Sequence, residues 1–279
     1  MIDIGGVVGV LLIVSNIIFS YKGFMNLSLF NAYKFEVDSV LIHKEYKRLL
    51  TSGFLHVGWT HLLLNMFTLY FFSDLLEIKL GRFYFLILYL LSLVGGNLFA
   101  LYIHRNHGNY SAVGASGAVS GVIFATIALY PGLGLSFFGL PFSIPSWIYG
   151  LFYVGYSIYG ITSNKDNIGH EAHLGGGLVG VLIAIAMKPN ALFENYLPIL
   201  LIVVPTLLFI YLIVTRPEIL ILNNFSLKQK STYFDIDKQY YEKKQNKQQE
   251  LDKLLDKISK KGIDSLSKKE KENLEKYSK

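Results

Sequence analysis

Cysteine is absent from the sequence, which excludes any disulfide and any thiolate–metal framework. Charge is scarce over most of the chain as well. The first 215 residues hold only 10 of the 26 basic residues and 9 of the 20 acidic ones. A stretch this close to neutral offers no basic face to nucleic acid, so we expect no nucleic-acid partner.

Apolar runs take the place of the missing charge. Hydrophobic residues make up 52% of the chain, and the mean hydropathy is +0.40. The first apolar run has no Lys or Arg before it and no A-x-A site after it, which favours a retained helix over a cleaved signal peptide. The sequence therefore predicts an all-α, polytopic membrane helix bundle of about seven spans. The runs cover residues 5–21, 54–72, 83–103, 114–130, 147–161, 172–187 and 197–215.

The remaining charge is concentrated in a tail. Residues 216–279 carry 16 basic and 11 acidic residues, so we divide the chain into a membrane domain, 1–215, and a basic, water-exposed tail, 216–279. Apolar residues at helical spacing and a capping box that begins at Ser267 predict a small helical hairpin in the tail. A hairpin of this size is stable only when docked, which makes another protein a candidate partner of the tail.

Two connecting segments are not expected to span a membrane. Residues 22–52 mix aromatic with charged side chains, which suits either an amphipathic segment in the membrane interface or an ordinary long loop. Residues 131–145 contain three glycines and three prolines, so we expect them to form turns and to contribute no chemistry.

His61 and Asn65 are polar side chains within a predicted span. Four residues apart, they lie on one face of a helix, from which both can donate hydrogen bonds into the same small volume. His56 falls about 180° around that helix from Asn65, so we expect it at the helix entrance, holding the preceding loop. Ionisable groups inside a span indicate a functional site, although polar contact between helices is the alternative interpretation.

Ser116 stands near the start of the fourth apolar run, between Gly114 and Gly117. At the amino end of a helix, unpaired N–H groups and the helix dipole favour a developing oxyanion. The same small residues are also typical of closely packed membrane helices. The motif alone therefore does not separate catalysis from packing.

His173 connects these two interpretations. Gly176 and Gly180 follow it at spacings that place all three on one face of a helix. If this face meets the glycine face of the Ser116 helix, the two backbones approach closely enough for the imidazole to reach Ser116. Glu171 lies on a different face, so the sequence predicts a Ser–His dyad rather than a triad.

These motifs, in this order on separate apolar helices, resemble the signature of the rhomboid family of intramembrane serine proteases, over about residues 47–180. The resemblance implies that Ser116 attacks a peptide bond and that His173 passes the serine proton to the leaving amine. It further implies that the Ser116 amide, His61 and Asn65 stabilise the oxyanion, with neither a metal nor a cofactor. Arg48 is expected to stabilise the first loop, and Glu77 to anchor a helix end.

The resemblance also implies a setting for the reaction. Substrates would be membrane proteins with a transmembrane or membrane-edge segment whose helix is easily destabilised. They would enter beside the fifth span, where residues 162–169 form a candidate lid.

We expect a multi-pass protein of a bacterial cell membrane. The family places the first loop outside the cytoplasm, whereas the basic residues of that loop favour the inside. The tail resembles a segment found at the carboxyl end of some bacterial rhomboid proteins.

One position departs from the family pattern, and two other functions stay open. Ser120 stands where many rhomboids have an aromatic residue packed on the catalytic histidine, which leaves the orientation of His173 open. The first alternative is a non-catalytic relative that binds membrane helices. The second is a metal-dependent intramembrane hydrolase that uses His56, His61, His170 and His173, although their spacing is not H-E-x-x-H.

Overall fold

The computed structural model describes residues 6–136, 143–163, 169–215, 257–258 and 267. The chain divides into two compact units, Met1–Leu227 and Lys228–Lys279. The helices and strands described below belong to the first unit. The helical hairpin predicted in the tail lies outside the described residues, as does most of the candidate lid.

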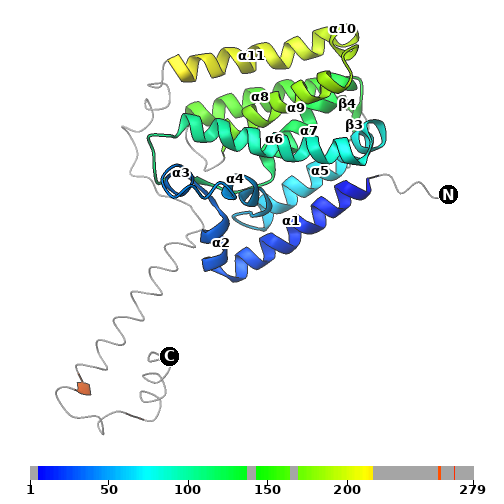
Figure 1. Ribbon diagram of the computed structural model, residues 1–279. Helices are drawn as coiled ribbons and strands as arrows, with labels where there is room; N and C mark the ends of the chain where they lie inside the picture. The colour runs from blue at the N-terminus through cyan, green and yellow to red at the C-terminus, as the bar shows by residue number, and fades with distance from the viewer. Residues whose placement is uncertain (1–5, 137–142, 164–168, 216–256, 259–266, 268–279) are drawn as a thin grey trace. The chain divides into compact units, whose positions relative to one another are not determined.

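Within the described residues, helices of 14 or more residues occupy each predicted apolar run (Figure 1). Four of them, α1, α6, α9 and α11, are long and apolar enough to cross a membrane. The prediction of a helical membrane bundle is confirmed. The long helices are α1 (Val7–Met25), α5 (Trp59–Leu80), α6 (Arg82–Ile103), α7 (Ser116–Leu129), α8 (Ser146–Ser163), α9 (His170–Met187) and α11 (Tyr196–Thr215).

Short elements fill the connections. The first loop contains α2 (Leu27–Tyr33), β1 (Phe35–Glu36), α3 (Val37–Leu41), α4 (Arg48–Thr51) and the 3-10 helix η1 (Ser52–Phe54). Later connections contain β2 (Ser111–Ala112), β3 (Gly134–Ser136), β4 (Ser143–Pro145) and α10 (Ala191–Glu194). The antiparallel pair β3–β4 stands in the segment that we expected to form turns alone, because Gly134 to Ser136 pair with Ser143 to Pro145.

The first loop is folded rather than irregular. Arg48 is 7% exposed, and its guanidinium donates to the carbonyl oxygens of Asn31 and Lys34 at 2.7 and 2.8 Å and to the Glu45 carboxylate at 2.6 Å. Strand β1 pairs with β2, and Phe35 faces Ala112 in the register. The loop is thereby attached to the segment that immediately precedes α7.

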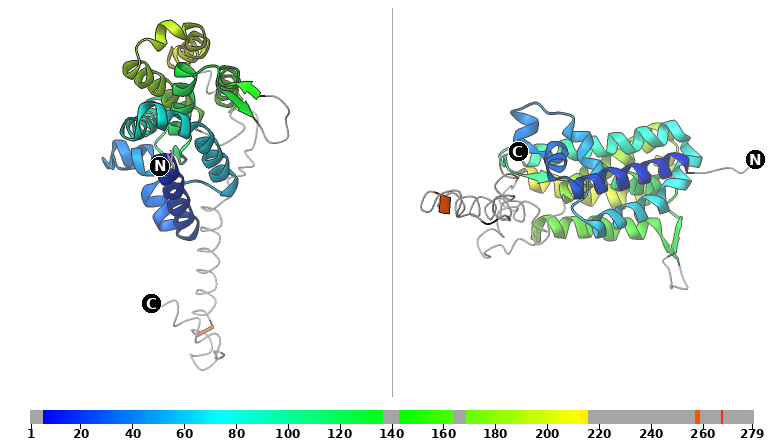
Figure 2. Two further views of the ribbon diagram at one scale, coloured as in Figure 1. Left: turned by 90° about the vertical axis from the view of Figure 1, so that its right-hand side faces the viewer. Right: turned by 90° about the horizontal axis from the view of Figure 1, so that it is seen from below.

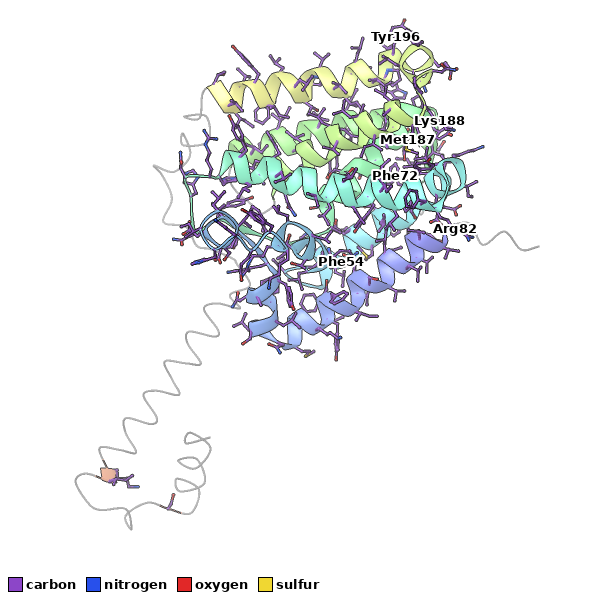
Figure 3. All side chains as sticks on the ribbon, viewed as in Figure 1. Phe54, Phe72, Arg82, Met187, Lys188 and Tyr196 are labelled. Carbon is purple, nitrogen blue, oxygen red and sulfur yellow. The ribbon has the colours of Figure 1, made fainter. Side chains whose placement is uncertain are left out.

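The connections between the long helices lie at two opposite ends of the bundle. Arg82, Lys188 and Tyr196 lie at the end where α5 turns into α6 and where α9 leads to α10 and α11 (Figure 3). The short helices α2, α3 and α4 lie toward the opposite end (Figures 1 and 2). Because the long helices alternate in direction, the amino ends of α5, α7 and α9 gather near α2–α4.

Helix α7 is the centre of the bundle. Its 14 residues span about 21 Å, less than the roughly 30 Å of a bilayer core, but all of them except Ser116 are buried by neighbouring helices. Helix α9 packs directly on it, as the glycine spacing predicts. A Cβ at Gly176 would collide with the carbonyl oxygen of Gly117, and one at Gly180 with that of Gly121.

Glu77 connects the far end of α5 to the start of α1. The carboxylate is 2% exposed and accepts hydrogen bonds from the N–H groups of Val8 and Gly9, both at 2.9 Å. These are first-turn N–H groups that have no partner within α1, so Glu77 acts as a cap supplied by another helix. Its location, at the opposite end of α5 from His61, separates it from the candidate site.

Candidate active site

Ser116 is the first residue of α7, and the chain reaches it through a constrained turn. Gly114 has a φ of 135°, a conformation that side-chain-bearing residues rarely adopt, and its N–H donates to the Ser52 carbonyl at 3.0 Å. The first i−4 bond of α7 runs from Val119 to Ala115. The N–H groups of Ser116 and Gly117 precede that bond, so they have no carbonyl partner within the helix.

His56 holds this turn from the other side. Its ring is fully buried just before α5, where Nε2 accepts the Ala115 N–H at 3.4 Å. Nδ1 is therefore the protonated nitrogen and donates to Ser20 Oγ of α1 at 2.8 Å, while Ser20 donates to the Phe54 carbonyl at 3.1 Å. The sequence placed His56 at the helix entrance; the structure adds that it links α1 to the turn before Ser116.

Burial lowers the pKa of His56 from 6.5 to about 3, with His61 as a secondary cause. The unfolded chain therefore binds a proton that the folded chain excludes as pH falls below 6.5. We expect the free energy of unfolding to fall with decreasing pH in this window, by up to about 1.4 kcal/mol per pH unit. A chemical-denaturation series of the detergent-solubilised protein between pH 7 and pH 4 measures it.

The matched control is His56→Gln, whose amide can accept the Ala115 N–H but does not titrate in this range. The difference in unfolding free energy between wild type and variant should shrink as the pH is lowered. Parallel pH profiles for the two proteins would contradict the assignment of this pH dependence to His56.

His61 lies on α5 beside Gly114. A Cβ at Gly114 would lie 2.9 Å from His61 Nε2 and 3.6 Å from Ser116 Oγ, so the imidazole and the hydroxyl border the same small space. His61 Nδ1 is buried and has no hydrogen-bond partner among the described residues. Asn65 follows one turn later, 7% exposed, and its amide donates to the His61 carbonyl at 3.0 Å. The amide has a second N–H, which that bond leaves uncommitted.

His173 lies in the first turn of α9 and is 5% exposed. Neither ring nitrogen has a hydrogen-bond partner in the part of the chain that the structure describes. The ring packs instead against Tyr153 of α8, at a centroid distance of 5.7 Å, and against His170, at 5.3 Å. Glu171 points elsewhere, with its carboxylate 3.3 Å from Nε2 of His104.

Ser116 and His173 lie on adjacent helices at the same level. Their chain neighbours are in contact, because a Cβ at Gly117 would lie 3.4 Å from the Ala172 carbonyl oxygen. The Ser116 hydroxyl does not hydrogen-bond to the imidazole, since neither nitrogen of His173 has a partner within the described residues. The packing of α7 on α9 therefore brings the backbones of these two residues close together.

The four histidines considered for a metal site, His56, His61, His170 and His173, are divided between two pairs. His56 and His61 pack on each other with centroids 4.9 Å apart, and His170 packs on His173. Across the described ranges, no three His, Asp or Glu side chains are arranged to hold a metal ion. Sequence reasoning missed Tyr153. The small Ser120 was the available signal, but it does not reveal which helix supplies the ring against His173.

Comparisons with known proteins match two parts of the chain to families. Residues 43–190 match the Rhomboid domain, and residues 234–279 match a family of unknown function (DUF6576). RHOMBOID-like protein 12, mitochondrial, of Arabidopsis thaliana is 34% identical over 151 residues, which cover 48% of this chain and 44% of that protein. Rhomboid protein 1, mitochondrial, of Saccharomyces cerevisiae is 31% identical over 157 residues, 54% of this chain and 45% of the relative.

A bacterial relative matches a shorter stretch. Putative rhomboid protease YdcA of Bacillus subtilis is 41% identical over 78 residues, 28% of this chain and 38% of that protein. The chain spans about half the length, or less, of these relatives. Two of these relatives are mitochondrial, and the chloroplastic Rhomboid-like protein 11 of Arabidopsis thaliana is 31% identical over 163 residues, so the similarity does not support the expectation of a bacterial cell membrane. The Rhomboid match covers more than half of the residues, and the helices form an apolar bundle around α7: the chain is a multi-pass membrane protein of the rhomboid family.

Proposed function

We propose that this chain is an intramembrane serine endopeptidase in which Ser116 is the nucleophile and His173 the general base. Membership of the rhomboid family supports an intramembrane protease-like function. The observation that carries the assignment to these two residues is the packing of α7 on α9. In this packing, a serine at the start of α7 lies beside the first turn of α9, which carries a histidine.

In the proposed reaction, rotation of the side chains first brings Ser116 Oγ to a ring nitrogen of His173. The imidazole takes the hydroxyl proton as Oγ bonds to the carbonyl carbon of the scissile peptide, which gives a tetrahedral oxyanion. The oxyanion collapses, the C–N bond breaks, and His173 returns the proton to the leaving amine. Water then hydrolyses the acyl-enzyme by the same two steps, with His173 again as base and acid.

The proposed oxyanion donors are the Ser116 N–H, His61, and Asn65 one turn further along α5. The Ser116 N–H is uncommitted within α7 and lies at the positive end of the helix dipole. His61 Nε2 borders the same space, and Asn65 has an N–H to spare. Since donors held in place before the reaction need no reorganisation, this arrangement favours the transition state over the bound peptide.

The membrane setting of the bundle leads us to propose a class of substrate, an entry route and a partner for the tail. A bilayer on all sides of the bundle favours transmembrane segments that unwind easily, since a peptide bond within a regular helix is shielded from Ser116. Entry beside α8 is the proposed route, and the lid proposed there falls largely on residues outside the described ranges. We also propose that the first loop faces away from the cytoplasm and that the basic tail, residues 216–279, docks on another protein.

A non-catalytic binder of membrane helices is the second candidate. The observation that favours it is the missing hydrogen bond between Ser116 and His173. Both residues are nevertheless present and adjacent, and catalytic hydrogen bonds are often completed only when substrate is bound.

A serine-directed fluorophosphonate separates these functions. We expect a tagged fluorophosphonate to label the wild-type protein in detergent and to leave Ser116→Ala unlabelled, because only an activated serine displaces the fluoride. Preincubation with a chelator should not change the labelling. Labelling that is absent from the wild type would favour the non-catalytic binder, and cleavage of a substrate that is lost with the chelator would favour a metal-dependent hydrolase.

A further inference from the structure

Two consecutive hydrogen bonds link α8 to the backbone of Ser116. Ser120 Oγ donates to the Ser116 carbonyl at 2.6 Å, and the Tyr153 hydroxyl lies 2.6 Å from the same Oγ. Because a serine has one hydroxyl proton and Ser120 uses it in the first bond, Tyr153 is the donor in the second. A side chain of α8 is thus connected to the residue that we propose as nucleophile.

The ring of the same tyrosine supports His173. The two ring planes are inclined by 31°, with centroids 5.7 Å apart. Since His173 has no hydrogen-bond partner within the described residues, ring packing rather than a carboxylate sets the plane of the imidazole. Tyr153 is itself fixed, because Tyr149 stacks on it and Phe124 of α7 meets it edge-on, each at a centroid distance of 6.2 Å.

We propose that Tyr153 is a positioning residue, which orients His173 and fixes the backbone of Ser116 only while α8 is packed against α7 and α9. The inference rests on the proposed function, because Tyr153 acts through the dyad and touches neither the substrate nor the reacting atoms. Ser120 makes the arrangement possible, since it is fully buried and small enough to leave room for a ring from α8.

This arrangement makes the geometry of the dyad depend on a third helix. A ring carried by α7 or α9 would stay in contact with the dyad even if α8 moved. The ring of Tyr153 belongs to α8, so a shift of α8 removes the support of the imidazole and the hydrogen bond to Ser120 together. Misplacing a catalytic group by about 1 Å can cost roughly 10²-fold in rate, so the packing of α8 would control turnover.

Steady-state cleavage of a membrane-spanning substrate in proteoliposomes tests the inference. Tyr153→Ala removes both ring and hydroxyl, and we expect kcat to fall about 10²-fold while KM changes by less than about twofold. Tyr153→Phe keeps the ring and should restore most of the lost kcat, leaving a deficit of no more than about 10-fold.

Ser120→Ala removes both hydrogen bonds of this link, whereas Tyr153→Phe removes only the second. The loss of kcat in Ser120→Ala should therefore be at least as large as in Tyr153→Phe, and the double variant should lose no more than Ser120→Ala alone, since the hydroxyl of Tyr153 acts through Ser120. Losses that multiply in the double variant would overturn the hydrogen-bonded link.

The control is Phe83→Ala, which removes an aromatic ring from the start of α6, where the side chain is 68% exposed and lies away from the proposed entry beside α8. This variant should keep the wild-type kcat. All variants are assayed well below their unfolding temperatures, so that each is fully folded. If the wild type cleaves and Tyr153→Ala matches Phe83→Ala, only the inference about Tyr153 fails. If the wild type neither cleaves nor reacts with the fluorophosphonate, the proposed function is contradicted, and the inference that rests on it is contradicted as well.

Discussion

Ser116→Ala and His173→Ala are each expected to abolish cleavage of a reconstituted membrane-spanning substrate, with kcat/KM lowered by at least about 10⁴-fold. The first variant removes the atom that forms the acyl-enzyme, and the second removes the group that accepts its proton. Asn65→Ala should give a graded loss of about 10²–10³ in kcat, because it deletes one oxyanion donor and leaves the dyad intact. Quantitative analysis of cleavage products over time measures all three.

The control for the serine variant is Ser157→Ala on α8. Ser157 is fully buried, and its hydroxyl has no hydrogen-bond partner within the described residues, so its removal should leave the rate unchanged. The double variant Ser116→Ala/His173→Ala should be no slower than either single variant, since residues that act as a unit are not additive. Residual turnover in Ser116→Ala within about 10-fold of wild type would contradict a serine mechanism.

Gly176→Ala is expected to destabilise the bundle by about 1–3 kcal/mol and to reduce activity as well. The added methyl group would collide with the Gly117 carbonyl oxygen and would lie 3.0 Å from the Ser92 carbonyl oxygen. Both are backbone atoms that cannot rotate away, so α7 and α9 must separate. Since His173 and Ser116 lie on these two helices, the separation also disturbs the dyad. Thermal unfolding in detergent and the cleavage assay measure the two effects.

Gly155→Ala on α8 provides the comparison. A Cβ at Gly155 would meet no atom within 4 Å, so the same chemical change lacks the collision. It should be neutral or stabilising by up to about 1 kcal/mol, because alanine has the higher helix propensity. Equal effects of the two substitutions on the unfolding temperature would show that glycine content, rather than the close approach of α7 and α9, determines stability here.

Features that depend on residues close together in the sequence could be predicted from it. The apolar runs located each long helix, because a helix must bury or expose its own apolar side chains in lipid. The spacing of His173, Gly176 and Gly180 on one helical face predicted the close contact of α9 with α7, which the structure contains. The same reasoning put Glu171 on another face, and its carboxylate contacts His104.

Apart from that glycine-lined contact, features that depend on distant segments meeting could not be predicted. The pairing of β1 with β2 joins residues more than seventy positions apart, so the polar composition of the first loop gave no sign of its folded state. His56 was recognised, but its partners Ser20 and Ala115 come from two other segments. The small side chain of Ser120 leaves a space beside His173, and the ring that fills this space belongs to Tyr153 of α8. The packing of the helices, and not the local sequence, determines which ring fills it. The sequence by itself determined the helices and the candidate residues that they carry, since periodicity is a local property, whereas the tertiary structure decided which side chains meet.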